Sequence, residues 1–181
     1  MPKPQHFNIN GQLLSSNPQH WIWNNLGNWA NENDYGMACQ ALARLHGQAA
    51  QLRAGQHVLE LACGYGAAFE LWKAEFKINT IRALEYRPQC VAHIKQQSLA
   101  QLVQISEGRF YPLPKQLTHV GYDAIVCVDA AYHAQSLAQF LGVIASVLKT
   151  EGRFAFSTLM LADDYANYQL TQRLFVQGVL R

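Results

Sequence analysis

Val58-Leu59-Glu60-Leu61-Ala62-Cys63-Gly64-Tyr65-Gly66 is the stretch of sequence that decides the fold. Its apolar first half predicts a short buried strand, and its second half predicts a turn with two glycines. Gly64 and Gly66 permit a tight turn and let a ligand approach the backbone without a Cβ in the way. A helix predicted from Ala67 would offer free N–H groups to an anion at this turn. The glycines alone also fit an ordinary strand-to-helix turn.

Strand and helix patterns alternate on both sides of this stretch. The predicted helices cover residues 34–52, 67–76 and 137–148, with one more beginning near Pro88, and the predicted strands cover 57–62, 80–85, 102–106, 122–129 and 153–161. A loop with Pro112 and Pro114 precedes the fourth strand, Gly152 lies in the turn before the fifth, and the tail from Asp163 predicts a final helix. The alternation predicts an α/β fold with a doubly wound, mostly parallel sheet. Ligands on such sheets bind beyond the carboxyl ends of the strands.

The composition is that of one globular domain. The chain has 181 residues, of which half are hydrophobic and 14% are charged, and its formal charge is +2. Lys and Arg are scattered, which argues against nucleic acid or an anionic membrane as a partner and favours a small molecule. We expect residues 1–33 to form an N-terminal lid segment. Residues 34–181 are expected to form a single α/β domain whose first helix is capped by Asp34.

The cysteines and the apolar segments indicate the cellular environment in which the protein works. Cys39, Cys63, Cys90 and Cys127 form no CxxC pair and no Cys/His cluster at zinc spacing, so no metal site is predicted. This usage suggests a reducing, cytoplasmic compartment. No apolar run is long enough to span a bilayer, so no integral membrane contact is expected. The histidines expected at the surface are His20, His46 and His93.

Several motifs together resemble the class I S-adenosylmethionine-dependent methyltransferases. Val58–Gly66 resembles their first motif, in which an apolar strand ends in an acid and a G-x-G-x-G turn. Residues 25–29 (NLGNW) resemble the N-x-G-x-W segment that lies over the cofactor in the branch acting on small natural products, sterols and phosphobases. Residues 122–126 (YDAIV) and 148–153 (LKTEGR) resemble the fourth strand and the turn before the fifth. The resemblance implies a Rossmann-like methyltransferase fold with S-adenosyl-L-methionine as cofactor.

The resemblance also implies where the cofactor binds. Glu60 would face the amino group of the methionine moiety, and Glu85, at the end of the second strand, would accept hydrogen bonds from the two ribose hydroxyls. Ala62 replaces the first glycine of the family, and it is tolerated if its φ stays negative. Phe110 would pack on the adenine. The residues expected to bind the cofactor are Trp29, Glu60, Ala62, Cys63, Gly64, Gly66, Glu85, Tyr86, Gly108, Arg109, Phe110 and Asp129.

Three features depart from the family's pattern. Arg109 follows Gly108 where the family commonly has an Asp near the adenine amino group, and Arg cannot accept that hydrogen bond. The fourth strand lacks the N/D-P-P-Y/F motif, which argues against methylation of nucleic-acid bases. The chain stops at Arg181, one helix after the fifth strand, where the family adds an antiparallel hairpin. We therefore expect the C-terminal strands to be lacking. Either the chain is a fragment, or the domain is degenerate, or a homodimer or another partner covers the edge of the fifth strand.

His133 and Asp129 are the candidate catalytic residues. Methyl transfer from a sulfonium is an in-line displacement that proximity and alignment accelerate. A hydroxyl acceptor also needs a base, and an imidazole suits that role near neutral pH. His133 follows the fourth strand, beside the expected methyl position, and Asp129 would orient it or touch the cofactor; a plain helix start at His133 fits equally well. Trp29 or Tyr35 could cover the sulfonium by a cation–π contact, although such aromatics more often form a hydrophobic lid.

Three functions remain open on the sequence. The first is S-adenosylmethionine-dependent methyl transfer to a small, lipid-like or natural-product acceptor. The second is a catalytically inactive or incomplete methyltransferase-like module that binds the cofactor and works with a partner. The third is an NAD-linked oxidoreductase, which Phe69 weighs against because it stands where a dinucleotide fingerprint has its third glycine.

Overall fold

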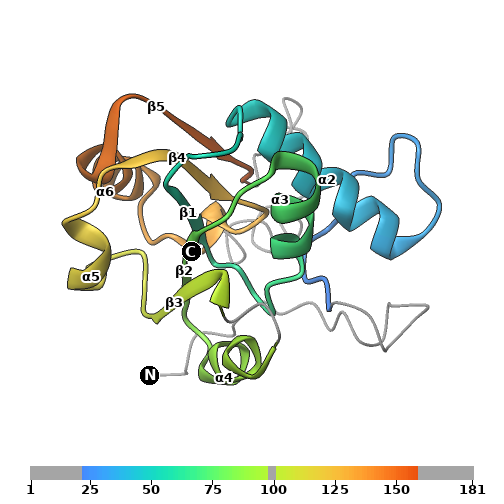
Figure 1. The fold of residues 1–181 in the computed structure, drawn as a ribbon, viewed down its shortest axis with the longest axis horizontal. Helices are drawn as coiled ribbons and strands as arrows, with labels where there is room; N and C mark the ends of the chain where they lie inside the picture. Colours follow the sequence, from blue (N-terminus) through green and yellow to red (C-terminus); the bar gives the residue numbers. More distant parts are fainter. Residues whose placement is uncertain (1–21, 98–100, 159–181) are drawn as a thin grey trace, which may run out of the picture.

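The fold is built on one five-stranded parallel sheet with helices on both faces (Figure 1). The computed structural model describes residues 22–97 and 101–158. The strands are β1 (Val58–Leu61), β2 (Ile81–Glu85), β3 (Val103–Glu107), β4 (Tyr122–Cys127) and β5 (Leu148–Phe156). The helices are α2 (Tyr35–Ala49), α3 (Ala68–Phe76), α4 (Pro88–Gln96), α5 (Lys115–Thr118), η2 (Ala131–His133) and α6 (Leu137–Val147). The helix predicted from Asp163 and the question of C-terminal strands lie outside the described residues.

The strand order confirms the predicted doubly wound sheet. The strands lie side by side in the order β3-β2-β1-β4-β5, and every pairing between them is parallel. The chain therefore runs outward from β1 to β3 and then returns to the other side of β1. Glu60 pairs with Ala83 of β2 on one side and with Val126 of β4 on the other, so it lies in the middle of the sheet. The order reverses between β1 and β4, where a ligand is expected to bind.

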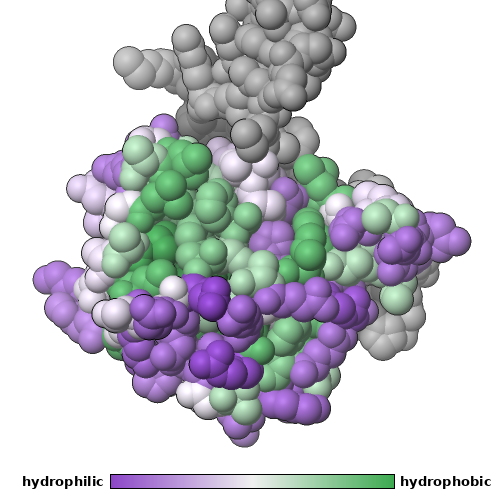
Figure 2. All heavy atoms as spheres, turned by 90° about the horizontal axis from the view of Figure 1, so that it is seen from above, coloured by the Kyte–Doolittle hydropathy of each residue, from purple (hydrophilic) through white to green (hydrophobic). Residues whose placement is uncertain are grey.

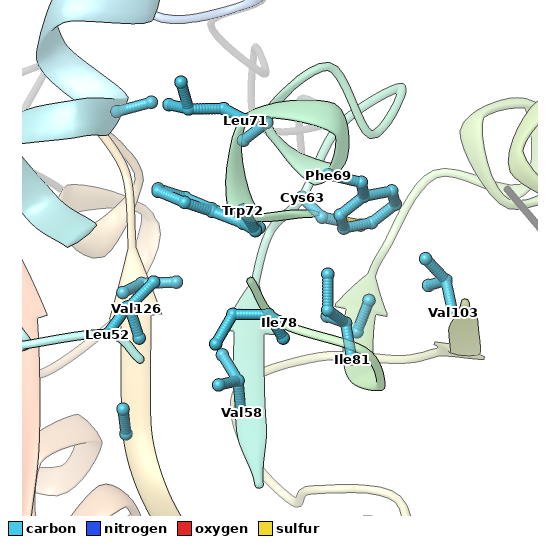
Figure 3. Close-up of a cluster of buried hydrophobic side chains, with 14 of the residues drawn as sticks. Leu52, Val58, Cys63, Phe69, Leu71, Trp72, Ile78, Ile81, Val103 and Val126 are labelled. Carbon is cyan, nitrogen blue, oxygen red and sulfur yellow. The ribbon is translucent and has the colours of Figure 1, made fainter. Parts of the chain in front are cut away.

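Successive side chains of β1 pack into two separate hydrophobic cores, one on each face of the sheet. Val58 packs on the face covered by α2, α3 and α4, whereas Leu59 and Leu61 pack on the face covered by α5 and α6. Strand residues alternate in this way because successive side chains point to opposite faces of a sheet. Figure 3 shows Phe69 and Trp72 of α3 over the strands of the first core. Both are buried, and burying each large side chain contributes about 1.5–3 kcal/mol.

The ends of the helices follow the predicted signals. Asp34 caps α2, because its side chain accepts a hydrogen bond from the Met37 amide at 3.0 Å. Ser136 caps α6 in the same way through the Gln139 amide. Pro88 occupies the first turn of α4. Backbone N–H groups there have no acceptor within the helix, so a proline, which lacks the N–H, costs no hydrogen bond. Within the described ranges, no helix has the length and apolar character that crossing a bilayer would require.

The buried face of α2 differs from the predicted one. The apolar residues that recur at steps of three and four, Ala38, Leu42, Leu45, Ala49 and Leu52, predict one buried face, but Leu45 is 51% exposed. Instead α2 turns small residues toward α3, and a Cβ on Gly47 would meet the Phe76 ring at 2.6 Å. This rotation buries His46, whose predicted surface position is therefore wrong. The His46 ring lies 2.8 Å from the Leu42 carbonyl oxygen, and burial lowers its pKa so that the neutral form is favoured.

The fifth strand begins earlier than its sequence predicts. Tyr122 pairs with Leu148, whereas Ala124 pairs with Arg153, so residues 149–152 form an irregular insertion in the ladder. Such bulges absorb extra residues by bending the strand. The turn expected at Gly152 therefore lies inside β5. The loop predicted before the fourth strand likewise contains the short helix α5.

β5 forms one edge of the described sheet and carries aromatic side chains. Phe154 and Phe156 stack with ring centroids 4.9 Å apart, and both are half-buried. Leu137 and Leu141 of the neighbouring α6 are exposed. Figure 2 shows hydrophobic residues gathered on the side of the molecule where α6 and β5 lie. The predicted homodimer or partner at this edge stays a prediction.

Substitution of Gly66 tests how much the packing of the glycine turn contributes to stability. Gly66 has a φ of +81°, and a Cβ there would approach the Phe69 ring to 2.5 Å. Gly55 has nearly the same φ of +82°, but its Cβ would meet nothing within 4 Å. We expect Gly55→Ala to lower the free energy of unfolding by about 1–2 kcal/mol through backbone strain alone. Gly66→Ala should cost about 1–3 kcal/mol more, because the ring must also move. Urea unfolding of both variants measures the difference, and equal losses would contradict the packing argument.

Candidate functional site

A cavity of about 730 Å³ opens at the carboxyl ends of the strands. Its size lies in the range of cofactor and small-molecule sites. The glycine turn after β1, the loops after β2, β3 and β4, and residues 22–25 all contribute to its walls. The predicted site residues that line it are Glu60, Ala62, Cys63, Gly64, Glu85, Tyr86, Gly108, Arg109, Phe110, Asp129 and His133. The position agrees with the expectation for a doubly wound sheet.

Two predicted residues lie away from the cavity lining. Trp29 is 51% exposed, and its indole N–H donates to the Leu26 carbonyl at 2.7 Å. Its ring lies 6.5 Å from that of Tyr35, so the two aromatics contact each other. Gly66 is buried beneath the turn against Phe69, where it shapes the backbone. Neither Trp29 nor Gly66 is among the residues that face the cavity.

The turn after β1 is more strained than the sequence suggests. Gly64 has a φ of +60°, which glycine adopts freely. Ala62 has a φ of +53°, so the condition under which alanine would be tolerated here, a negative φ, is not met. An alanine in this conformation costs roughly 1–2 kcal/mol, because its Cβ crowds the following carbonyl. Ala62 lines the cavity, and strained backbone of this kind is often found at ligand-binding sites.

Glu85 holds this turn in place from the end of β2. One carboxylate oxygen accepts a hydrogen bond from the Gly64 amide at 2.7 Å. The other accepts from the amides of Tyr86 and Arg87 and from the Arg87 guanidinium, at 2.9–3.0 Å. The carboxylate is buried, and bonds to a charged acceptor are about twice as strong as neutral ones. Glu85 therefore fixes the position of the cavity floor.

Arg87 is a residue of this site that the sequence reasoning missed. Its Nε lies 2.9 Å from the Glu85 carboxylate, and its guanidinium carbon lies 5.9 Å from the centre of the Tyr65 ring. Arg87 lines the cavity, so it is placed to contact whatever Glu85 binds. The sequence spacing could have indicated this contact. A cationic side chain two residues after an acid at a strand end can fold back and pair with that acid.

Glu60 lies deeper, in the middle of the sheet. It is 3% exposed, and its carboxyl group accepts a short hydrogen bond from the Trp72 indole N–H. Burial raises the pKa of Glu60 to about 8, the indole bond opposes this shift, and the nearby Glu85 adds to it. Near neutral pH the site therefore contains one carboxyl that favours its protonated form. A cation placed beside Glu60 would favour its ionised form instead.

The stability of the protein should accordingly depend on pH through Glu60. Its pKa is raised from 4.5 to about 8 on folding, so the folded state binds more protons between these values. The free energy of unfolding should fall as pH rises through this window, by up to about 1.4 kcal/mol per pH unit. Urea unfolding at pH 5.5, 7.0 and 8.5 measures the slope. Glu60→Gln keeps an acceptor for Trp72 but has no proton to lose, so its slope should be smaller. Parallel slopes would contradict this assignment.

Aromatic side chains form another wall of the cavity. The Arg109 guanidinium lies 4.3 Å from the centre of the Tyr86 ring and donates to its hydroxyl at 3.1 Å. Phe110 packs on Phe140 of α6 with ring centroids 4.9 Å apart. Flat rings and a stacked guanidinium can hold a planar group such as a purine. Arg109, which departs from the family's pattern, is thus part of this wall rather than a hydrogen-bond acceptor in it.

The loop after β4 carries both candidate catalytic residues. Asp129 is 9% exposed, and its carboxylate accepts a hydrogen bond from the Leu26 amide at 2.7 Å. Burial raises its pKa, and the Leu26 bond opposes that shift. His133 ends the 3-10 turn η2 and is exposed at the rim of the cavity, and its ring lies tilted against that of Tyr132 with centroids 4.4 Å apart. The structure thus brings both residues to one cavity.

The sequence also matches a known protein family. The family described as methyltransferase domain matches residues 59–156, which is more than half of the chain. A sterol 24-C-methyltransferase of Gibberella zeae is 27% identical over 125 residues. That match covers 67% of this chain and 32% of the relative, so the chain spans about a third of the relative's length. The family match over residues 59–156 spans the glycine turn, Glu85 and the loop after β4.

Solved structures share the fold at low sequence identity. Coclaurine N-methyltransferase, solved with N-methylheliamine and S-adenosylhomocysteine (SAH), is 19% identical with a TM-score of 0.62. The match covers 73% of this chain and 39% of that one. The [4+2]-cyclase SpnF is 20% identical with a TM-score of 0.63, over 73% of this chain and 50% of that one. One fold therefore occurs in proteins named for different reactions, and the reaction must be argued from the site.

Proposed function

This chain belongs to the methyltransferase domain family, and from that premise we propose that it transfers a methyl group from S-adenosylmethionine to a small-molecule acceptor. The cofactor would supply an electrophilic methyl group on a sulfonium, a reactive centre that side chains lack. The described chain would bind it, align it with the acceptor and exclude water. These are the tasks that accelerate an in-line displacement.

The observation that carries this proposal is the pair of buried acids on the cavity floor. Glu85 is the last residue of β2, Glu60 is the last but one of the neighbouring β1, and both are buried and line the cavity. A ligand with a cationic group at one point and a diol at another satisfies both acids, and S-adenosylmethionine has an amino group and a ribose. Gly64 lines the cavity beside them without a side chain of its own, and the Asn24 and Arg87 side chains lie 3.4 Å from the place of a Cβ there. The residues present therefore fit the cofactor.

Each part of the cavity has a proposed task. Glu60 would hold the amino group, and Glu85 with Arg87 would hold the ribose. The stacked Arg109 and Tyr86, together with Phe110, would enclose the adenine. His133 would accept the proton that a hydroxyl acceptor releases, since it stands at the rim of the cavity.

The acceptor is proposed to be largely apolar. The segment that carries His133 also lines the cavity with Ala130 and Ala134, and with the uncharged Gln135 and Ser136. Apolar walls favour a ligand that loses little hydration on binding. The relative from Gibberella zeae is named for a sterol, and the solved N-methyltransferase was crystallised with N-methylheliamine. Both names support a lipid-like or natural-product acceptor.

Calorimetric titration and a transfer assay test the proposal in sequence. The chain is titrated with S-adenosylmethionine, SAH and NAD, and then incubated with methyl-labelled cofactor and a panel of sterols, phenols and secondary amines. We expect micromolar binding of the two adenosyl ligands, none of NAD, and label on at least one acceptor. NAD binding without adenosyl binding would overturn the proposal in favour of an oxidoreductase.

A second candidate is a cofactor-binding module that works with a partner. The half-buried aromatic side chains of the edge strand β5 favour it, because Phe154 and Phe156 leave part of their apolar surface available to another chain. In that case the adenosyl ligands bind but no acceptor is labelled by the chain alone. Light scattering of the purified chain would then be expected to reveal a dimer or a co-purified protein.

A further inference from the structure

Residues 22–33, hereafter the strap, precede α2, and their first four residues line the cavity. Hydrogen bonds from α2 hold one side of the strap. The Tyr35 hydroxyl donates to the Asn25 carbonyl at 3.0 Å, and the Cys39 thiol donates to the same oxygen at 3.3 Å. These bonds join the strap to the helix that follows it in the chain. These bonds do not connect the strap to the sheet. A separate contact must hold the strap over the strand ends that form the cavity floor.

Asp129 makes that connection. Its carboxylate accepts a hydrogen bond from the Leu26 amide at 2.7 Å, across 103 residues of sequence. The Asp129 amide in turn donates to the Ser157 hydroxyl at 2.8 Å, so the end of β4 is tied to the residue that follows β5. Asp129 also has a φ of +52°, a conformation that Asp and Asn tolerate better than other residues with a side chain. The backbone thus turns this carboxylate toward the strap.

We propose that Asp129 is a positioning residue, which fastens the strap to the end of β4 so that residues 22–25 close the cavity over the cofactor. The inference rests on the proposed function for the identity of the ligand. It replaces the expectation that Asp129 orients His133 or acts in the chemistry. What the position needs is a hydrogen-bond acceptor for Leu26 and a residue that accepts a positive φ, and it does not need a charge.

Three substitutions separate these requirements. Asp129→Asn keeps an acceptor oxygen and tolerates the positive φ. Asp129→Gly relaxes the backbone but removes the acceptor, and Asp129→Ala removes the acceptor and adds strain. Hydrogen exchange of the Leu26 amide reports the contact directly, and calorimetry with SAH reports the cavity. We expect the Asn variant to stay within threefold of the unsubstituted chain in both readings. The Gly variant should lose Leu26 protection and bind SAH about 10-fold more weakly.

The outcomes distinguish this inference from the proposed function. An Asn variant that binds as weakly as the Gly variant, while its Leu26 amide stays protected, would overturn the inference, because the charge and not the contact would then matter. A Gly variant with a protected Leu26 amide and full affinity would overturn it as well. If the unsubstituted chain fails to bind SAH although its Leu26 amide is protected, the proposed function fails, and the closing role over a cofactor fails with it.

Discussion

Replacing Glu85 by alanine is expected to weaken the binding of SAH by about 100-fold or more. The variant loses the acceptor for the ribose, and hydrogen bonds to a charged group are each worth about 1.5–3 kcal/mol. It also leaves the Gly64 amide and the Arg87 guanidinium without the carboxylate that they contact. The glycine turn would then lose its anchor as well as its ligand. Calorimetric titration of both chains with SAH measures the loss.

Because Glu85→Ala also removes structural contacts, a second variant is needed. Glu85→Gln keeps the shape and one acceptor oxygen, so we expect it to fold and still bind SAH at least 10-fold more weakly. Glu151→Gln is the matched control, since Glu151 lies in the insertion within β5 and is exposed. It should bind as the unsubstituted chain does. Full affinity in a folded Glu85→Gln chain would rule out Glu85 as the ribose ligand.

Replacing His133 by alanine is expected to lower turnover of a hydroxyl acceptor by about 10²–10⁴-fold, the usual contribution of a general base. The affinity for SAH should stay within threefold, because His133 stands at the cavity rim, away from Glu60 and Glu85 on the floor. Single-turnover transfer from saturating cofactor measures the effect. The two readings together separate chemistry from binding.

Tyr132 provides the control for His133. Its ring lies tilted against the imidazole with centroids 4.4 Å apart, and burial raises the pKa of its hydroxyl, so the hydroxyl holds its proton. Tyr132→Phe keeps the ring and should preserve most of the turnover. If His133→Ala retains turnover while Tyr132→Phe abolishes it, the tyrosine hydroxyl takes over the role assigned to the histidine.

The sequence predicts the fold well because its signals are local. Asp34 and Pro88 mark helix starts by their own chemistry, and the alternation of strands and helices implies the parallel sheet. The errors concern residues whose placement depends on distant partners. His46 is buried because Gly47 lets Phe76 come close, which no pattern within α2 reveals. Gly152 lies in a bulge rather than a turn because β4 sets the register of β5.

The candidate site is predictable in outline and not in its internal contacts. Residues at or next to the carboxyl ends of parallel strands, such as Glu85 and Glu60, lie at one edge of the sheet, so their gathering follows from topology. Which groups they contact does not follow. The bond of Glu60 to Trp72 needs the packing of α3, and that of Asp129 to Leu26 joins segments 103 residues apart. Trp29 has the spacing of a cofactor contact, yet its indole bonds to its own segment.

The central place of β1 in the sheet sets an order of events during synthesis. Its neighbour β4 begins only at Tyr122, and the bond between the His57 amide and the Asp123 side chain spans 66 residues. At about 5–20 residues per second, a ribosome needs roughly 3–13 s to make that stretch. During that time β1, with Val58 and Leu59, has been synthesised, but β4, the strand that pairs with it on one side, has not. A chaperone that binds extended apolar segments would find its target in β1 at this stage, and would be displaced by the arrival of β4.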